Sequence, residues 1–127
     1  MKHKWRWIIG SICLLLLICG VFAMHHIVDQ ANKLSIETPE LEKIDDGIYI
    51  GEYHITPVSV MVQVSVEDDK ISDITILKHE HGLGGKAEKI VKDVINKQSL
   101  DVDTISGATV SSKCILKAIE QAIEKGE

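Results

Sequence analysis

A segment rich in hydroxyl groups lies near the end of the chain, and its residue types suit phosphate binding. Residues 98–112 read QSLDVDTISGATVSS. Gly107 permits a tight backbone approach, and a helix predicted to follow it would offer unpaired N–H groups and the positive end of its dipole. Such a helix start binds phosphate readily. Further donors come from the hydroxyls and the ammonium group of Thr109, Ser111, Ser112 and Lys113.

The same residues have a second interpretation that needs no ligand. Ser106 or Thr109 could be the N-cap of the helix, a role worth about 1 kcal/mol. Spacing alone does not decide between a capped helix and a phosphate site, so both interpretations stay open at this point.

Strands and helices around this segment predict a small α+β domain. A strand rich in β-formers begins at Gly47, and Val58 to Val66 place valine at every second position, which indicates a strand with one apolar face. Residues 71–78 alternate again after the turn at 67–70, so the two strands are predicted to form an antiparallel hairpin. Apolar stripes predict amphipathic helices over about 86–97 and 110–125, which could cover the valine face.

The N-terminal segment is predicted to be a transmembrane anchor. Trp7 to Met24 contains no charged residue, and its 18 residues are near the minimum that spans a hydrocarbon core. Lys2, Lys4 and Arg6 precede it, so the positive-inside rule places the N-terminus in the cytoplasm and the rest outside. A cleaved signal peptide ending near Ala23 and a lipoprotein site at Cys19 are the alternatives. The predicted division is 1–24 tip and anchor, 25–45 stalk and 46–127 domain.

Composition narrows the function of the part that follows the anchor. Three of the 14 Lys and Arg residues precede residue 29, which leaves 11 against 19 acidic residues and a net charge of −8. Without a basic patch, a nucleic-acid partner is not expected. Cys13 and Cys19 lie in the anchor, so Cys114 has no disulfide partner outside and is predicted to be a small buried hydrophobe. A cysteine-poor exported domain fits a bacterial envelope.

The segment Asp103 to Thr109, DTISGAT, resembles the D-x-x-S-G-A-T signature of the FMN-binding domain family. This module occurs in the C and G subunits of sodium-translocating NADH:quinone reductase and Rnf complexes, and in small membrane-anchored flavoproteins. The resemblance covers most of residues 46–126. It includes the DGIYIG start at 46–51, the valine-rich strand, the glycine-bearing loop at 79–85, the QSLDVD run and the SGATVSS helix start.

The resemblance implies that FMN is attached through a phosphoester to Thr109 by a flavin transferase that uses FAD and magnesium. The transferase would recognise Asp103, for which ordinary loop solvation or an Asx turn is the alternative role. The implied function is a membrane-anchored, extracytoplasmic electron carrier without turnover of its own, with membrane redox proteins or quinone-linked donors as partners. The implied cofactor-binding residues are Ser106, Gly107, Ala108, Thr109, Ser111 and Ser112, together with Gly82, Leu83 and Gly84 in the glycine-bearing loop.

One departure from the family keeps other functions open. The larger redox subunits have a loop of the form E-T-P-G-x-G, where this chain reads HEHGLGG at 79–85. The Glu-Thr-Pro contacts therefore do not transfer, and an accessory module that holds flavin loosely or lacks it is the alternative. His79 and His81, with His54, also suggest a metal site, but nothing supplies a fourth ligand, and solvated or flavin-adjacent histidines are the alternative. A flavin reductase would need a dinucleotide fingerprint, which the sequence lacks.

Overall fold

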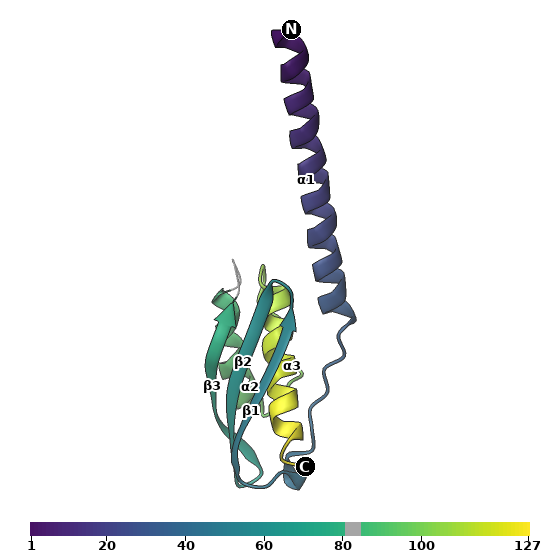
Figure 1. Ribbon diagram of the computed structural model, residues 1–127. Coiled ribbons are helices and arrows are strands. Elements are labelled where there is room, and N and C mark those ends of the chain that lie inside the picture. The colour runs from purple at the N-terminus through teal and green to yellow at the C-terminus, as the bar shows by residue number, and fades with distance from the viewer. Residues whose placement is uncertain (81–84) are drawn as a thin grey trace.

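The computed structural model describes residues 1–80 and 85–127 and has the predicted α+β architecture, with a long apolar helix before it. Strands β1 (Gly47–Ile55), β2 (Val58–Glu67) and β3 (Lys70–Glu80) form an antiparallel sheet in the order β1-β2-β3. The helices are α1 (Lys2–Lys33), α2 (Ile90–Lys97) and α3 (Thr109–Glu124), and two short 3-10 helices are η1 (Leu41–Lys43) and η2 (Gly85–Lys89). Figure 1 shows α1 extending away from the sheet and α3 packed behind β1 and β2.

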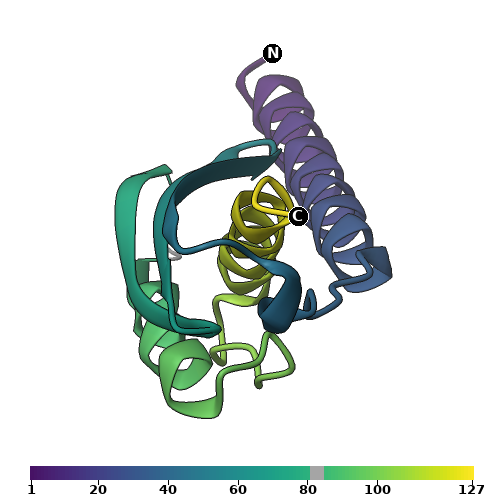
Figure 2. The ribbon, with the colours of Figure 1, turned by 90° about the horizontal axis from the view of Figure 1, so that it is seen from below.

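Helix α3 fills the concave side of the sheet, as Figure 2 shows. It packs against β1 and β2, while α2 lies beside β3. The valine face of β2 is buried, and so is the apolar stripe predicted for the last helix. The predicted helix over 86–97 begins as the 3-10 turn η2 and continues as α2, and Ala87, Ile90 and Val94 are buried on its inner side. Both helices therefore cover the sheet as the apolar periods predicted.

Glycine allows the closest contact between the sheet and α3. A β-carbon placed on Gly51 would lie 2.0 Å from the carbonyl oxygen of Ala118 and 2.9 Å from the β-carbon of Ala122. No side chain fits in that space, because non-bonded carbon and oxygen atoms need more than 3 Å. Gly51 and the two alanines thus set how closely β1 approaches α3.

The strict alternation predicted for 71–78 is wrong in detail. Ile71 and Ile74 are both buried although they are three positions apart. The register between β2 and β3 shifts between Ser65 and Val66, and again between Met61 and Val62. Each β-bulge inserts an extra residue into one strand and so changes which side chains face the core. Because of these two shifts, His79 at the end of β3 turns its side chain inward, where only 2% of it is exposed.

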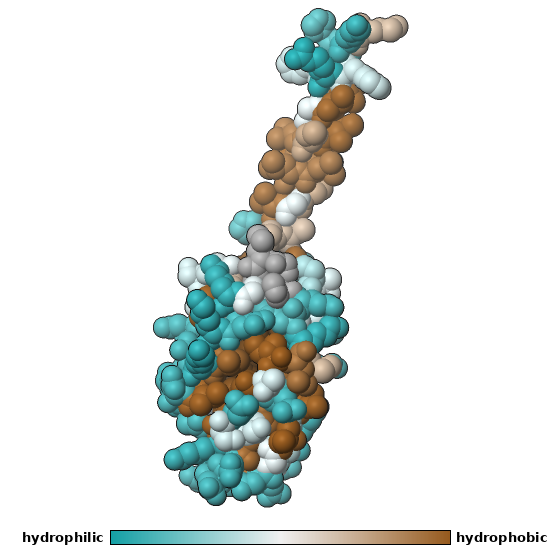
Figure 3. Space-filling view, turned by 90° about the vertical axis from the view of Figure 1, so that its left-hand side faces the viewer, coloured by the Kyte–Doolittle hydropathy of each residue, from teal (hydrophilic) through white to brown (hydrophobic). Residues whose placement is uncertain are grey.

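Helix α1 is long and apolar enough to cross a membrane, and it is the one such helix among the described residues. Figure 3 shows its apolar middle as a brown column between a hydrophilic tip and the domain. The helix continues beyond the apolar stretch to Lys33, and Ala31 near its end is fully buried against the domain. Residues 34–45, which fall within the predicted stalk, also pack on the domain, where Ile44 is buried and Ile36 and Leu41 join the core.

Candidate functional site

The predicted phosphate-binding segment forms a tight turn at the start of α3. Gly107 has a φ of +76°, a conformation that favours glycine. The turn is closed by the Ala108 N–H, which donates to the carbonyl of Ile105 at 2.9 Å. Thr109 follows as the first residue of α3, half-buried, and within the described part of the chain its hydroxyl has no hydrogen-bond partner. A hydroxyl is thus presented where the helix dipole and free N–H groups favour a phosphate.

The structure removes the helix-capping interpretation. The N-cap position is occupied by Ala108, which has no side-chain cap, and neither Ser106 nor Thr109 takes that role. The fully buried hydroxyl of Ser112, farther along the helix, stabilises the turn instead. The Ser112 Oγ accepts a hydrogen bond from the Ile105 N–H at 3.0 Å and donates to the Ala108 carbonyl at 2.7 Å. Ser112 therefore holds the turn in shape from inside the protein.

Ser111 also lies inside the domain, where it contacts the end of β3. Its hydroxyl is 3.1 Å from Nε2 of His79, and Nδ1 of the same ring is 3.0 Å from Oε1 of Glu88 on η2. The serine is 2% exposed, whereas about half of the Glu88 side chain is exposed. A chain of polar groups therefore runs from the surface carboxylate through the imidazole to the first turn of α3. This arrangement ties three elements together beside Thr109.

Lys86 brings a positive charge to the turn. A β-carbon placed on Gly107 would lie 2.7 Å from the Lys86 Nζ and 3.3 Å from its Cε, so the lysine side chain lies directly over the glycine. An ammonium group at this position, next to a helix N-terminus, favours an anion bound at the turn. Any residue larger than glycine at 107 would displace the lysine and would also be strained by the positive φ.

The predicted site residues fall into three groups. Ser106, Gly107, Ala108 and Thr109 form the turn itself. Ser111 and Ser112 lie behind it with their hydroxyls already hydrogen-bonded within the protein. Gly82, Leu83 and Gly84 lie outside the described residues.

Sequence reasoning missed Lys86 and Glu88, and it named His79 only with His81 and His54 as a metal candidate or as a flavin-adjacent or solvated side chain. Lys86 is 21 positions from Gly107 and no motif connects them. A weak signal for η2 was available, because Lys86 and Glu88 directly follow the glycine-bearing loop.

Two further candidates from the sequence are the predicted metal site and the thiol of Cys114. No cluster of three His, Cys, Asp or Glu side chains able to hold a metal occurs within residues 1–80 and 85–127. Cys114 is fully buried, and burial raises the pKa of its thiol to about 11. At neutral pH the group is therefore a protonated thiol, as its position on the apolar stripe of α3 predicted.

Comparison with known proteins agrees with this geometry. The model of the FMN-binding domain matches residues 54–124, and the chain belongs to the FMN-binding domain family. An NADH:acrylate oxidoreductase of Vibrio harveyi is 38% identical over 66 residues, which are 50% of this chain and 7% of that protein. A urocanate reductase of Eggerthella lenta is 39% identical over 66 residues, which are 50% of this chain and 11% of that protein. The chain thus corresponds to a small part of either relative.

Proposed function

We propose that the protein is a membrane-anchored electron-transfer flavoprotein that carries FMN through a phosphoester to Thr109. The observation that supports this assignment is the position of the Thr109 hydroxyl at the first residue of α3. It lies two residues after Gly107, and the Lys86 ammonium group lies over that glycine. Membership of the FMN-binding domain family supports FMN as the ligand. In the bound form, the isoalloxazine ring would supply reversible electron transfer, which none of the side chains at this turn can supply.

The residues around Thr109 fit a phosphoester better than a loosely held nucleotide. The free N–H groups at the start of α3 and the Lys86 ammonium would stabilise the single negative charge of the phosphodiester. The described domain offers few groups to stack on a flavin ring, since Tyr49 and Tyr53 are the only aromatic residues after Phe22 in the whole chain. A covalent tether removes the need for strong stacking and leaves an edge of the ring open to redox partners.

Attachment would require a separate flavin transferase. The Thr109 oxygen would form a bond to the FMN phosphorus of FAD, the bond between the two phosphates would break, and AMP would leave. The hydroxyl proton would pass to a base of the transferase. Thr109 is partly exposed at the N-terminal end of α3, and Asp103 in the preceding loop is exposed, so both are accessible to a second protein.

The proposed location follows from α1. Its apolar length fits a single membrane span, and three basic residues precede that span. By the positive-inside rule the domain lies outside the cytoplasm, where it exchanges electrons with membrane redox proteins or quinone-linked donors.

The test is coexpression of the full chain with a flavin transferase, followed by a denaturing gel viewed for flavin fluorescence. We expect a bright band from the wild type and from Thr109→Ser, and a dark band from Thr109→Ala. Thr104→Ala is the matched control, because Thr104 lies in the same loop at a variable position of the signature. A dark wild-type band or a bright Thr109→Ala band would contradict the covalent assignment. Colour that is lost on denaturation would instead indicate a binding module with loosely held flavin.

A further inference from the structure

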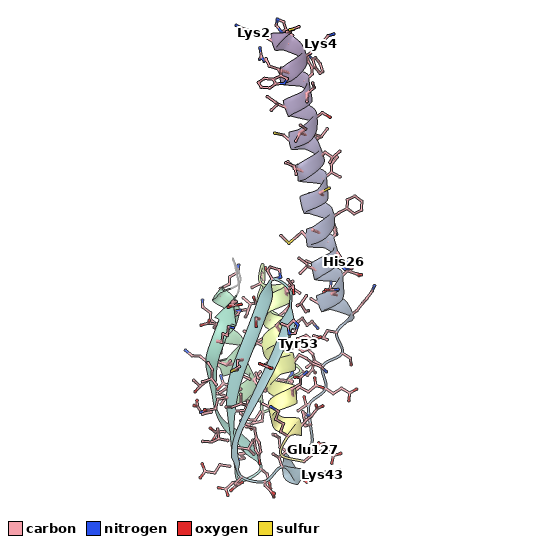
Figure 4. The ribbon with its side chains drawn as sticks, viewed as in Figure 1. Lys2, Lys4, His26, Lys43, Tyr53 and Glu127 are labelled. Carbon is pink, nitrogen blue, oxygen red and sulfur yellow. The ribbon has the colours of Figure 1, made fainter. Side chains whose placement is uncertain are left out.

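The end of α1 is docked onto the domain, so the anchor and the domain form one body. Ala31 is fully buried, and Ile27 packs against the core. A shallow groove between the two parts is lined by His26 and Gln30 from α1 and by residues 53–56 at the end of β1 and in the turn that follows it. Figure 4 shows His26 and Tyr53 near the same end of the domain. The part of α1 that directly follows Met24 therefore lies beside the loop that joins β1 to β2.

The segment after α1 is also fixed. The Lys117 Nζ donates to the Ser35 carbonyl at 3.1 Å, and the Glu37 N–H donates to Oε2 of Glu120 at 3.4 Å. Lys117 and Glu120 are themselves paired at 2.9 Å, and the carboxylate side chain is only 7% exposed. The two side chains lie on α3, so they hold the linker along this helix. The domain is thereby prevented from swinging freely below its anchor.

This docking gives the domain a defined membrane-proximal end. Helix α3 begins at Thr109 at the end nearest the apolar part of α1, and β1 and β3 finish at that same end (Figure 1). The opposite end contains η1, the turn at 68–69 and the C-terminus. The site turn and His79 therefore lie on the side of the domain that faces the apolar part of α1.

The membrane-proximal end and the opposite end of the domain also differ in charge. Lysines outnumber carboxylates at the end of β3, on η2 and near the start of α3: Lys78, Lys86, Lys89 and Lys113 against Glu80 and Glu88. Carboxylates outnumber lysines at the opposite end, where Asp46 accepts a hydrogen bond from the Asp68 N–H at 3.0 Å: Glu42, Asp45, Asp46, Glu67, Asp68, Asp69 and Glu127 against Lys43, Lys70 and Lys125. Lysines at a membrane surface are attracted by anionic lipid headgroups, while carboxylates are repelled.

From the docked helix and this charge division we infer that the Thr109 end of the domain is an interaction surface for the lipid headgroup layer. The inference rests on the proposed membrane span and extends the proposed function. A redox group carried at Thr109 is presented to the membrane, so its electron partner is one dissolved or embedded in the bilayer. Soluble partners would have to reach it past the bilayer surface.

Fluorescence quenching of the full chain in vesicles tests the orientation without any flavin. A dye is attached to Lys78→Cys or to the matched control Lys70→Cys, in a chain whose Cys13 and Cys19 are replaced by alanine. Both lysines are exposed residues of β3 and are eight positions apart along the strand, which corresponds to about 26 Å. Cys114 is buried and protonated and does not compete for the dye. The vesicles contain phosphatidylcholine, phosphatidylglycerol and a lipid with a nitroxide on its headgroup.

We expect the nitroxide lipid to reduce the emission of the Lys78→Cys dye several times more than that of the Lys70→Cys dye. Equal quenching at the two positions, or stronger quenching at Lys70→Cys, would overturn the proposed orientation. Flotation of the same vesicles on a density gradient is measured first. A chain that does not float with lipid overturns the membrane span itself, whereas the flavin gel described above reports separately on Thr109.

Discussion

The Nε2 atom of His79 lies 3.1 Å from the Ser111 Oγ, and this hydrogen bond joins the end of β3 to the first turn of α3. Both side chains are nearly fully buried. A buried polar group that loses a partner costs about 1–3 kcal/mol. The contact therefore contributes to the shape of the site turn, because Ser111 is only two residues after Thr109.

We expect Ser111→Ala to lower the free energy of unfolding by about 1–2 kcal/mol, because the imidazole keeps its burial and loses one hydrogen bond. Pulse proteolysis of the full chain in detergent micelles across a urea series measures this change. Ser106→Ala is the control, since Ser106 is exposed and its replacement should change the stability by less than about 0.5 kcal/mol. Equal effects of the two variants would show that the contact does not stabilise the domain.

Lys86 should affect how readily flavin is attached to Thr109. Its ammonium lies over Gly107, so Lys86→Met removes a positive charge from the place proposed for the phosphate. We expect the initial rate of flavin attachment at limiting transferase to fall roughly fivefold, which corresponds to about 1 kcal/mol. The difference should shrink at high salt, because the charge is exposed and is screened. Lys89→Met, on the same 3-10 turn, should leave the rate unchanged, and an equal fall in both variants would exclude a specific role for Lys86.

Local patterns in the sequence predicted the main elements correctly. The alternating valines predicted β2, and the apolar stripe predicted α3 to within a residue at either end. What the patterns could not show was the register of β3. Its two bulges depend on how the strand pairs with β2, and they bring Ile71, Ile74 and His79 to one face at spacings that a period of two does not give. The sequence of β3 alone therefore could not predict that the His79 side chain points into the domain.

The site was predictable where its residues are adjacent and was not where they come from distant segments. The SGAT turn is a continuous stretch, and its position before a helix followed from the periodicity of the next residues. Lys86 reaches Gly107 only because η2 and the start of α3 pack together. Ser35 and Lys117 meet across 82 residues for the same kind of reason, so the ordered linker was not visible in the sequence.

Gly51 limits the separation of β1 and α3, and its replacement should be costly. A β-carbon at this position would lie 2.0 Å from the backbone oxygen of Ala118, which cannot move without shifting the helix. We expect Gly51→Ala to lower the free energy of unfolding by about 3 kcal/mol, the upper part of the range for overpacking. Gly47→Ala in the same strand is the control, because its nearest neighbour is the flexible Tyr49 side chain at 3.4 Å. A milder effect at Gly51 than at Gly47 in the urea series would contradict this account.

Variants of the Lys117 and Glu120 pair should affect the stability of the domain and the order of the linker differently. Lys117→Met leaves the Glu120 carboxylate buried without its counter-charge, and we expect a loss of about 2 kcal/mol, less than for a fully buried pair because Lys117 is about one fifth exposed. Replacing both residues by methionine removes the uncompensated charge, so most of that stability should return.

The linker should respond differently, because its contacts to the Ser35 carbonyl and the Glu37 N–H need both polar side chains. We expect hydrogen exchange and protease cleavage within 34–40 to rise in the single and the double variant alike. If the double variant restored protection of 34–40 together with stability, apolar packing of Ile36 and Leu41 would be sufficient to hold the linker, and the polar pair would have no part in orienting the domain.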